Sequence, residues 1–242
     1  MNPNESTEST GKSRRALRTK KRRRIQSENR PEINISSLDQ FPFRSPSLLL
    51  EDAQIVCNQL GYIPTNLVDI GSRDTETNVP QTIVLYALNK NDSINGRYSK
   101  GLWQPFPTMI WMSCPILKSK ISKLEGEGYI SEFQERLVNE SGDPSPTSTS
   151  SPSYLRQMET AHRLYANERW DRLTDEDKAI VERNGWSDSL GSEVGVAGIR
   201  DFSSVKCLHC HYAHFLARPD HGNIIGAWTD SVLKSQENTE TS

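Results

Sequence analysis

Cysteine and histidine can bind metal ions or act as nucleophiles and bases, and they are concentrated in VKCLHCHYAH, residues 205–214. This stretch holds two of the four cysteines and three of the five histidines of the 242-residue chain. The pattern predicts a helix over residues 204–217. At about 3.6 residues per turn, four of these side chains would share one face of the helix, at positions i, i+3, i+4 and i+7. They are Cys207, Cys210, His211 and His214.

One helix face cannot complete a metal site, because side chains two turns apart do not converge on a single ion. A zinc site here would take about two ligands from this helix and the rest from elsewhere. Cys57 and Cys114 are the cysteines that remain. The paired CxxC motifs that are typical of structural zinc are missing. His209 precedes His214 by five positions, which rotates it roughly 140° away unless the helix begins later than residue 204.

The composition points to a soluble intracellular protein with some unpacked chain. Hydrophobic residues make up 34% and aromatic residues 7% of the sequence, which is low for a fully globular protein. Apolar runs stay well short of the roughly 20 residues of a membrane span, and the N-terminus has no apolar core of a secretory signal. We expect a nuclear or cytoplasmic protein that makes no membrane contact. Its cysteines are then expected to be reduced thiols.

A strongly basic segment precedes the rest of the chain. Residues 12–30 contain ten Lys or Arg and one Glu, whereas the whole chain has a net charge of −2. Such a block of like charges repels itself, so we expect a disordered basic arm over residues 1–44. Its partner would be a nuclear import receptor or a nucleic acid, and a solvated tail without a partner remains an alternative. The acidic character of the remainder favours import.

Short helical and strand patterns alternate after this arm. SPSLLLEDAQIVCNQLG predicts a helix from an N-cap at Ser45 to a stop at Gly61. TNLVDIG, PQTIVLYAL and PTMIWMSC are β-branched and aromatic runs that predict three strands. A hydrophilic stretch with an Asn-Gly turn, residues 89–107, separates the last two strands. Two helices are expected next, separated by Gly126 and Gly128.

The second half begins with an irregular insertion rich in Ser, Pro and Thr, residues 140–153. YLRQMETAHRLYANERWDRL then predicts a helix, and Thr174 begins another with a capping box. A glycine-rich loop, residues 185–201, precedes the Cys/His stretch and lets the backbone approach a ligand or a strand closely. The sequence therefore predicts a single α+β domain over residues 45–232, with a small antiparallel sheet of about three strands packed by helices. Residues 233–242 are expected to form a polar tail.

Two segments resemble a known family. PFPTMIWMSCP, and GVAGIRDFSSVKCLHCHYAH followed by GNIIGAW, are similar to the domain of unknown function 501 family, over roughly residues 50–230. The family pattern joins a Pro-Phe-Pro-Thr strand ending in Cys-Pro to a Lys-Cys-Leu-His helix, a further Ala-His and a terminal Asn-Pro-x-Gly. Ile224 replaces that proline here, and Cys210 and His211 stand where the family more often has small or aliphatic residues. The family has no established activity that the resemblance could imply for this chain.

The resemblance implies a site built from its shared residues. Cys114 ends a strand just before the proline that opens a helix, where the helix dipole favours a thiolate or an anion. If the fold joins this strand end to the C-terminal helix, the ligands of a zinc ion would be Cys114, Cys207, His209 and His214. Candidates for binding a small anionic ligand beside the glycine-rich loop are Lys206, His209 and Asn223.

Three interpretations of the Cys/His stretch stay open: a metal site, a metal-free pocket, and a packed core in which cysteine behaves as a small apolar residue. They lead to two kinds of function. The first is an enzymatic or small-ligand-binding domain that uses the Cys/His cluster. The second is a non-catalytic adaptor whose cluster only packs and whose basic arm directs it to the nucleus or to a nucleic-acid complex.

Overall fold

The structure is a computed structural model that describes residues 32–90, 103–139 and 153–240. The basic run at residues 12–30, the Asn-Gly turn and nearly all of the Ser/Pro/Thr-rich insertion lie outside the described residues. In the described parts, no helix combines the length and the apolar character needed to cross a membrane.

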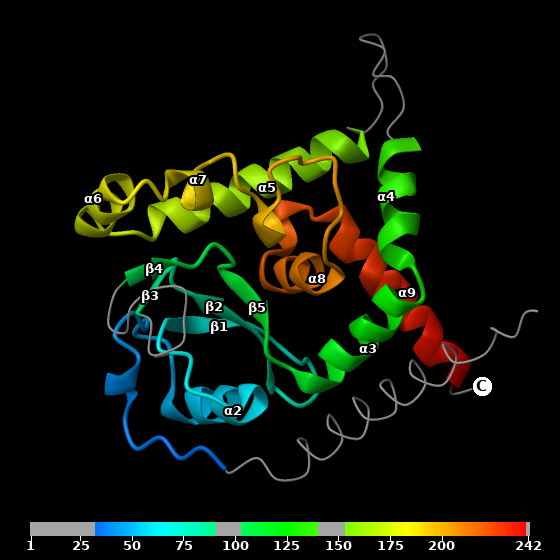
Figure 1. Cartoon of the computed structure of the whole chain (residues 1–242). Coiled ribbons are helices and arrows are strands. Elements are labelled where there is room, and N and C mark those ends of the chain that lie inside the picture. Colours follow the sequence, from blue (N-terminus) through cyan, green and yellow to red (C-terminus); the bar gives the residue numbers. More distant parts are fainter. Residues whose placement is uncertain (1–31, 91–102, 140–152, 241–242) are drawn as a thin grey trace, which may run out of the picture.

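A three-stranded antiparallel sheet lies at the centre of the fold (Figure 1). Its middle strand, β2 (Pro80–Leu85), pairs with β1 (Leu67–Arg73) on one side and with β5 (Ile110–Met112) on the other. A separate two-stranded ribbon is formed by β3 (Leu88–Lys90) and β4 (Trp103–Pro105). The expected α+β class with a three-stranded antiparallel sheet is confirmed, whereas β4 falls within the stretch that the sequence indicated as a hydrophilic connection.

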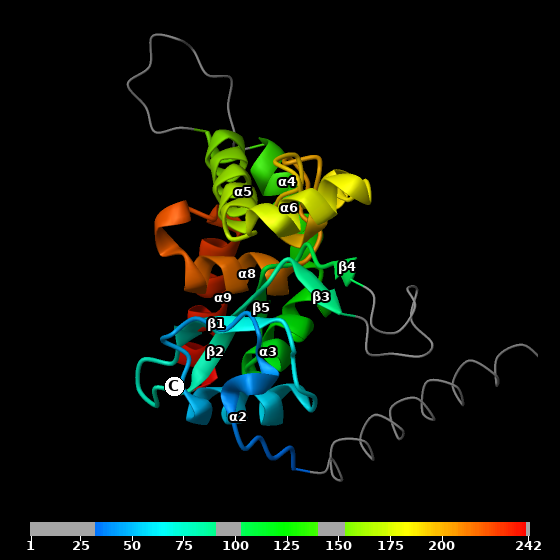
Figure 2. The ribbon, with the colours of Figure 1, turned by 90° about the vertical axis from the view of Figure 1, so that its left-hand side faces the viewer.

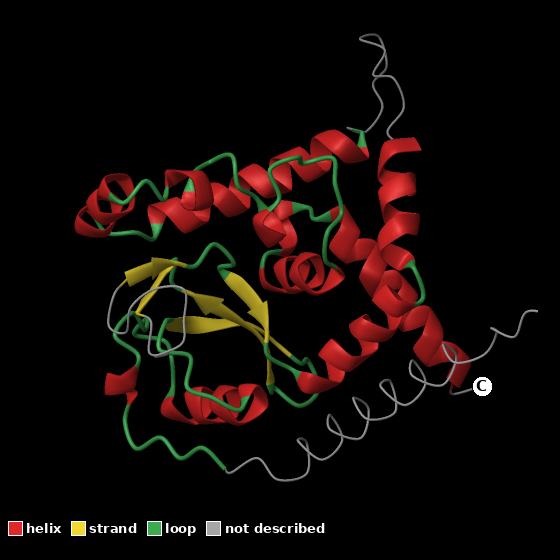
Figure 3. Cartoon of the chain, in the orientation of Figure 1, coloured by secondary structure: helices red, strands yellow, loops and turns green. Residues whose placement is uncertain are grey.

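Helices cover both faces of the sheet (Figure 3). Alternate side chains of a strand point to opposite faces, so Leu67, Ile83 and Leu85 pack in one core cluster with α2 (Leu50–Leu60). Val68 and Val84 pack in a second, larger cluster with α8 (Leu208–Ala217). The sheet therefore separates two apolar cores, and α8 lies on the side that holds most of the helices.

The helix α2 ends as the sequence predicts, with Gly61 in the left-handed conformation at φ 77° and its N–H bonded to Cys57 O. Its expected N-cap at Ser45 is wrong, because the helix begins at Leu50. The Ser45 hydroxyl instead donates to Asp69 at 2.7 Å, a contact with β1 that draws it away from the helix.

The remaining helices follow the second half of the chain, and α8 lies between the sheet and α5 in both Figure 1 and Figure 2. The expected cap at Thr174 is confirmed, since its side chain accepts the Asp177 N–H at 3.1 Å. The α-helices are α3 (Pro115–Gly126), α4 (Tyr129–Asn139), α5 (Tyr154–Asp171), α6 (Asp175–Arg183), α7 (Ser187–Leu190) and α9 (Ile224–Glu240). Short 3-10 turns are η1 (Leu38–Gln40), η2 (Val196–Gly198) and η3 (Pro219–His221).

Both ends of the expected domain are corrected. Ile35 and Phe41 are buried in the α2 core, so packed chain begins well before residue 45. At the other end, α9 continues to Glu240 and its Leu233 is buried, so most of the expected polar tail is helical.

Candidate functional site

The first turn of α8 is tied to the end of α3 by one carboxylate. Cys207 is the N-cap residue of α8 and has an extended backbone, with φ −158° and ψ 118°. The next residue, Leu208, donates its backbone N–H to Glu125 Oε1 of α3 at 2.8 Å. A negative charge is favourable at the N-terminus of a helix, where backbone N–H groups lack partners within the helix. Glu125 thereby fixes the position of α8 relative to α3.

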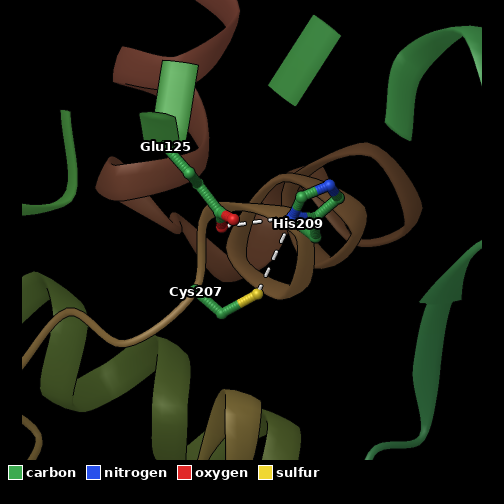
Figure 4. Close-up of side chains that lie close together, drawn as sticks. All are labelled: Glu125, Cys207 and His209. Atoms are coloured by element: carbon green, nitrogen blue, oxygen red, sulfur yellow. Dashed lines mark hydrogen bonds and ion pairs between the residues drawn. The ribbon is translucent and has the colours of Figure 1, made fainter. Parts of the chain in front are cut away.

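Glu125, Cys207 and His209 converge at this junction (Figure 4). Their ligand atoms all lie within 4.8 Å of one another, and all three residues are half-buried. His209 Nδ1 is 3.1 Å from Glu125 Oε1 and 4.0 Å from Cys207 Sγ. Within the described ranges, these residues form the group of His, Cys, Asp and Glu side chains that could hold a metal ion.

The other ring nitrogen of His209 is held by α3. Its Nε2 lies 3.1 Å from the Lys118 carbonyl oxygen and 3.3 Å from Ser122 Oγ. A carbonyl oxygen can only accept, so Nε2 carries the proton that it donates. Metal-binding histidines commonly hold their second nitrogen in this way, which leaves the first nitrogen aimed at the ion. Here that nitrogen is Nδ1, which faces the sulfur and the carboxylate.

Without a metal ion, the surroundings of the cluster favour a positively charged His209 and a negatively charged Cys207. The pKa of His209 is raised to about 9, chiefly by its hydrogen bond with Cys207 and with help from Glu125. The pKa of the Cys207 thiol is lowered, first by a hydrogen bond from the Cys210 thiol and also by His209. The pKa of Cys210 is raised, with Cys207 as the largest cause. These shifts favour a charged His209 beside a Cys207 thiolate.

The structure brings together only part of the zinc set expected from the sequence. Cys207 and His209 belong to the cluster, while Cys114 and His214 lie outside it. Cys114 is the N-cap residue of α3, and its backbone N–H donates to Gln81 O at 3.2 Å. His214 is fully buried, and its Nε2 pairs with His221 Nδ1 at 3.0 Å.

The helix face expected from the sequence is also corrected. The segment before Leu208 is drawn out of the helix by contacts with α4, since Val205 N–H donates to Gln134 Oε1 at 2.7 Å. Cys207 therefore precedes α8 rather than standing within it, and His209 turns towards α3. His211 and His214 are buried instead.

The buried histidines form a packing cluster around Asn223. The Asn223 amide nitrogen lies 3.2 Å from His211 Nδ1 and 3.0 Å from His214 Nδ1, while its Oδ1 accepts the Gly226 N–H at the start of α9. Its polar atoms are thus engaged in capping α9 and fixing two rings. On α5, His162 Nδ1 accepts the Val196 N–H at 3.0 Å. These buried histidines therefore match the interpretation in which the side chains pack as part of the core.

The residues expected to bind an anion do not lie together: two are at the α3–α8 junction and one is among the buried histidines. Lys206 is exposed immediately before Cys207, and His209 lies in the cluster at the α3–α8 junction. Asn223 is only 1% exposed and lies among the buried histidines. Glu125 was not singled out by the sequence, because it is one of 31 acidic residues and stands 83 positions before the backbone group that it binds.

Comparison with known proteins agrees with the resemblance described above. No curated protein and no solved structure matches the chain. A family model described as protein of unknown function (DUF501) matches residues 72–231, a range that includes Glu125, Cys207 and His209. The chain therefore belongs to the DUF501 family.

Proposed function

We propose that this protein binds zinc through Glu125, Cys207 and His209 and uses the remaining coordination position to bind a small anionic ligand. The observation that supports the proposal most strongly is the orientation of His209. The Nε2–H of His209 donates to the Lys118 carbonyl oxygen. Its Nδ1 faces the Cys207 sulfur and a Glu125 carboxylate oxygen, and these three atoms all lie within 4.8 Å of one another.

Zinc is the metal that best fits this donor set. Thiolate sulfur, imidazole nitrogen and carboxylate oxygen are its usual ligands, whereas magnesium and calcium prefer oxygen alone. Zinc sites with three protein ligands keep a position for water or substrate, in contrast to closed structural sites with four. Three side chains from two elements therefore favour a ligand-binding centre over a purely structural one.

The surroundings favour an anion at that position. Lys206 is exposed next to Cys207 in the chain. The first turn of α8 also presents the positive end of a 10-residue helix, which attracts negative charge. A small anion that replaces zinc-bound water would meet both features. This interpretation retains Lys206 and His209 as ligand-binding residues and leaves Asn223 with a structural role.

Calorimetric titration of the chelator-treated full-length protein with zinc tests the proposal. We expect one zinc per chain for the wild type and for Cys114→Ser, and no saturable binding for Cys207→Ser. Cys114→Ser is the matched control, because it removes a half-buried thiol that also stands at a helix N-cap but lies outside the cluster. Equal binding by both variants would contradict the assignment.

The basic segment supports a second, independent proposal about partners. Residues 12–30 carry ten Lys or Arg and one Glu, a charge pattern that suits a nuclear import receptor or nucleic-acid phosphates. A fluorescent reporter fused to residues 1–40 is expected to enter the nucleus. The same fusion with Lys20, Lys21, Arg22, Arg23 and Arg24 replaced by Gln is expected to stay outside. Nuclear exclusion of both fusions would refute the import proposal.

A further inference from the structure

We propose that Cys207 and Cys210 form a reversible disulfide by exchange with a low-molecular-weight disulfide, and that this oxidation releases the metal ion. The first part concerns the two thiols alone. The second part rests on the proposed zinc site, because it removes one of that site's ligands.

The positions of the two cysteines suit this reaction. Cys207 is the N-cap residue of α8, and Cys210 stands three positions later in the first helical turn. The side chain of an N-cap residue reaches over the first turn towards the third helical residue, which here is Cys210, and disulfides join residues whose Cα atoms lie about 4.4–6.8 Å apart. Both thiols are free and half-buried, so neither is sealed from solvent. Because Cys207 stands outside the regular helix, its extended backbone can adjust to close the bond without unwinding α8.

The two thiols differ in their surroundings, which gives them different roles. Cys210 stands in the first turn of α8 and is packed against the large apolar core. Cys207 lies at the helix N-terminus beside the exposed Lys206, where an incoming disulfide reaches it first. A cysteine at a helix N-terminus near a cation is the arrangement found in reactive thiols. Cys207 is thus the attacking residue and Cys210 the resolving one.

The reaction balances with a disulfide such as oxidised glutathione as the oxidant. The Cys207 thiolate attacks one sulfur of the small disulfide, forms a mixed disulfide and expels one glutathione thiolate. Cys210 then releases its proton to solvent, attacks Cys207 Sγ and expels the second glutathione thiolate. The protein loses two electrons as two thiols become one disulfide. The glutathione disulfide gains those electrons, and each expelled thiolate takes up a proton.

The other cysteines provide internal controls. Cys57 is fully buried in the α2 core, on the opposite side of the sheet from α8. Cys114 is half-buried at the N-cap of α3 and has no second cysteine within its first turn. Neither of them has a second cysteine close by in the chain, as Cys207 has in Cys210. Oxidation by a small disulfide should therefore be selective for the pair in α8.

Oxidation and metal binding would exclude each other, because a disulfide sulfur carries no thiolate charge for zinc. A ligand that binds only the reduced form multiplies the equilibrium ratio of reduced to oxidised protein by one plus the ligand concentration divided by its dissociation constant. Zinc at ten times its dissociation constant should therefore raise about tenfold the value, at half-oxidation, of the oxidised glutathione concentration divided by the square of the reduced glutathione concentration.

The experiment equilibrates the full-length protein with glutathione buffers of graded ratio, with and without zinc, followed by acid quenching, alkylation and peptide mapping. We expect a Cys207–Cys210 disulfide in the wild type and in Cys114→Ser. Cys210→Ser should stop at a glutathione adduct on Cys207. Because the wild-type map is informative by itself, a poorly folded variant would not obscure the result.

Each outcome bears on one part of the proposal. Free thiols at Cys207 and Cys210 throughout the series, or pairing of Cys207 with Cys114, would overturn the disulfide itself. A disulfide whose midpoint is the same with and without zinc would keep the thiol chemistry and overturn its link to the metal. Zinc binding without any disulfide would keep the proposed function and remove only the redox inference.

Discussion

Glu125 Oε1 lies 3.1 Å from His209 Nδ1 and also accepts the Leu208 N–H at 2.8 Å, so one carboxylate oxygen both positions α8 and faces the ring of its second residue. Glu125 is far from Leu208 and His209 in the chain, but it contacts both of them in the fold. The contact explains why the cluster depends on α3 as much as on the cysteine- and histidine-rich stretch.

Replacing Glu125 by Gln tests this double role. The amide oxygen can still accept the Leu208 N–H, while the negative charge that favours a cation is lost. We expect the fold to persist and the zinc affinity to fall by about 10- to 100-fold or more. Competition with a chromophoric chelator measures the affinity. Glu127→Gln, two positions further on at the C-cap of α3 and outside the cluster, should bind as the wild type does; a similar loss in both variants would contradict the role of Glu125.

Acid should destabilise the protein through His162. Burial lowers its pKa to about 4, below the value of about 6.5 in the unfolded chain. Its ring stacks on Phe202 and lies edge-on to His211 of α8, and its Nδ1 accepts the Val196 N–H. The neutral ring is the folded form, so stability is retained above about pH 6.5 and lost as the pH falls towards 4.

The size of this effect can be isolated with His162→Gln, which keeps an acceptor for the Val196 N–H and removes the titration. Between pH 7.5 and pH 5 the wild type should lose about 2 kcal/mol more unfolding free energy than the variant. Urea unfolding at both pH values measures the difference. Identical pH dependence of the two proteins would show that His162 titrates alike in the folded and unfolded states.

Two helical glycines should respond in opposite directions to alanine. A Cβ at Gly226 in α9 would clash with Phe215 Cβ and lie 2.7 Å from the His211 carbonyl oxygen, whereas a Cβ at Gly126 in α3 meets nothing within 4 Å. Gly226→Ala should therefore cost about 1–3 kcal/mol by forcing α8 and α9 apart. Gly126→Ala should stabilise by up to about 1 kcal/mol. Thermal unfolding compares the two, and similar small changes would refute the close approach of the helices.

Arg169 should be the most sensitive position of α5. It is fully buried and donates to the carbonyl oxygens of Leu190, Gly191 and Val194, so it holds the chain that follows α7. Lys cannot reproduce the planar fork of donors, and each unsatisfied buried carbonyl costs about 1–3 kcal/mol. Arg169→Lys should therefore cost about 3 kcal/mol in urea unfolding. Arg163→Lys, an exposed change on the same helix, should cost less than about 1 kcal/mol; comparable losses would contradict the role of Arg169.

The sequence predicted the elements that depend on local patterns. The strand runs, the glycine stop of α2 at Gly61 and the cap at Thr174 follow from side-chain periodicity and backbone preference, and all appear in the structure. The short strand β4 was missed because its pairing with β3 depends on a contact with another segment rather than on its own composition.

The site was predicted only in part for the same reason. Cys207 and His209 could be named from their types, but their grouping depends on where α8 begins, and that start is set by the contact of Val205 with Gln134 on α4. Glu125 enters the cluster only through the packing of α3 against α8. Cys114 and His214 were expected to join on the basis of the resemblance, and the chain places them elsewhere.

The most direct test of the central claim is the zinc content of the full-length protein purified without chelator, measured by plasma mass spectrometry. The proposed site predicts close to one zinc per chain in the wild type and in Cys114→Ser, and almost none in Cys207→Ser. Metal-free wild-type protein, or zinc retained by Cys207→Ser, would contradict a zinc centre at Glu125, Cys207 and His209.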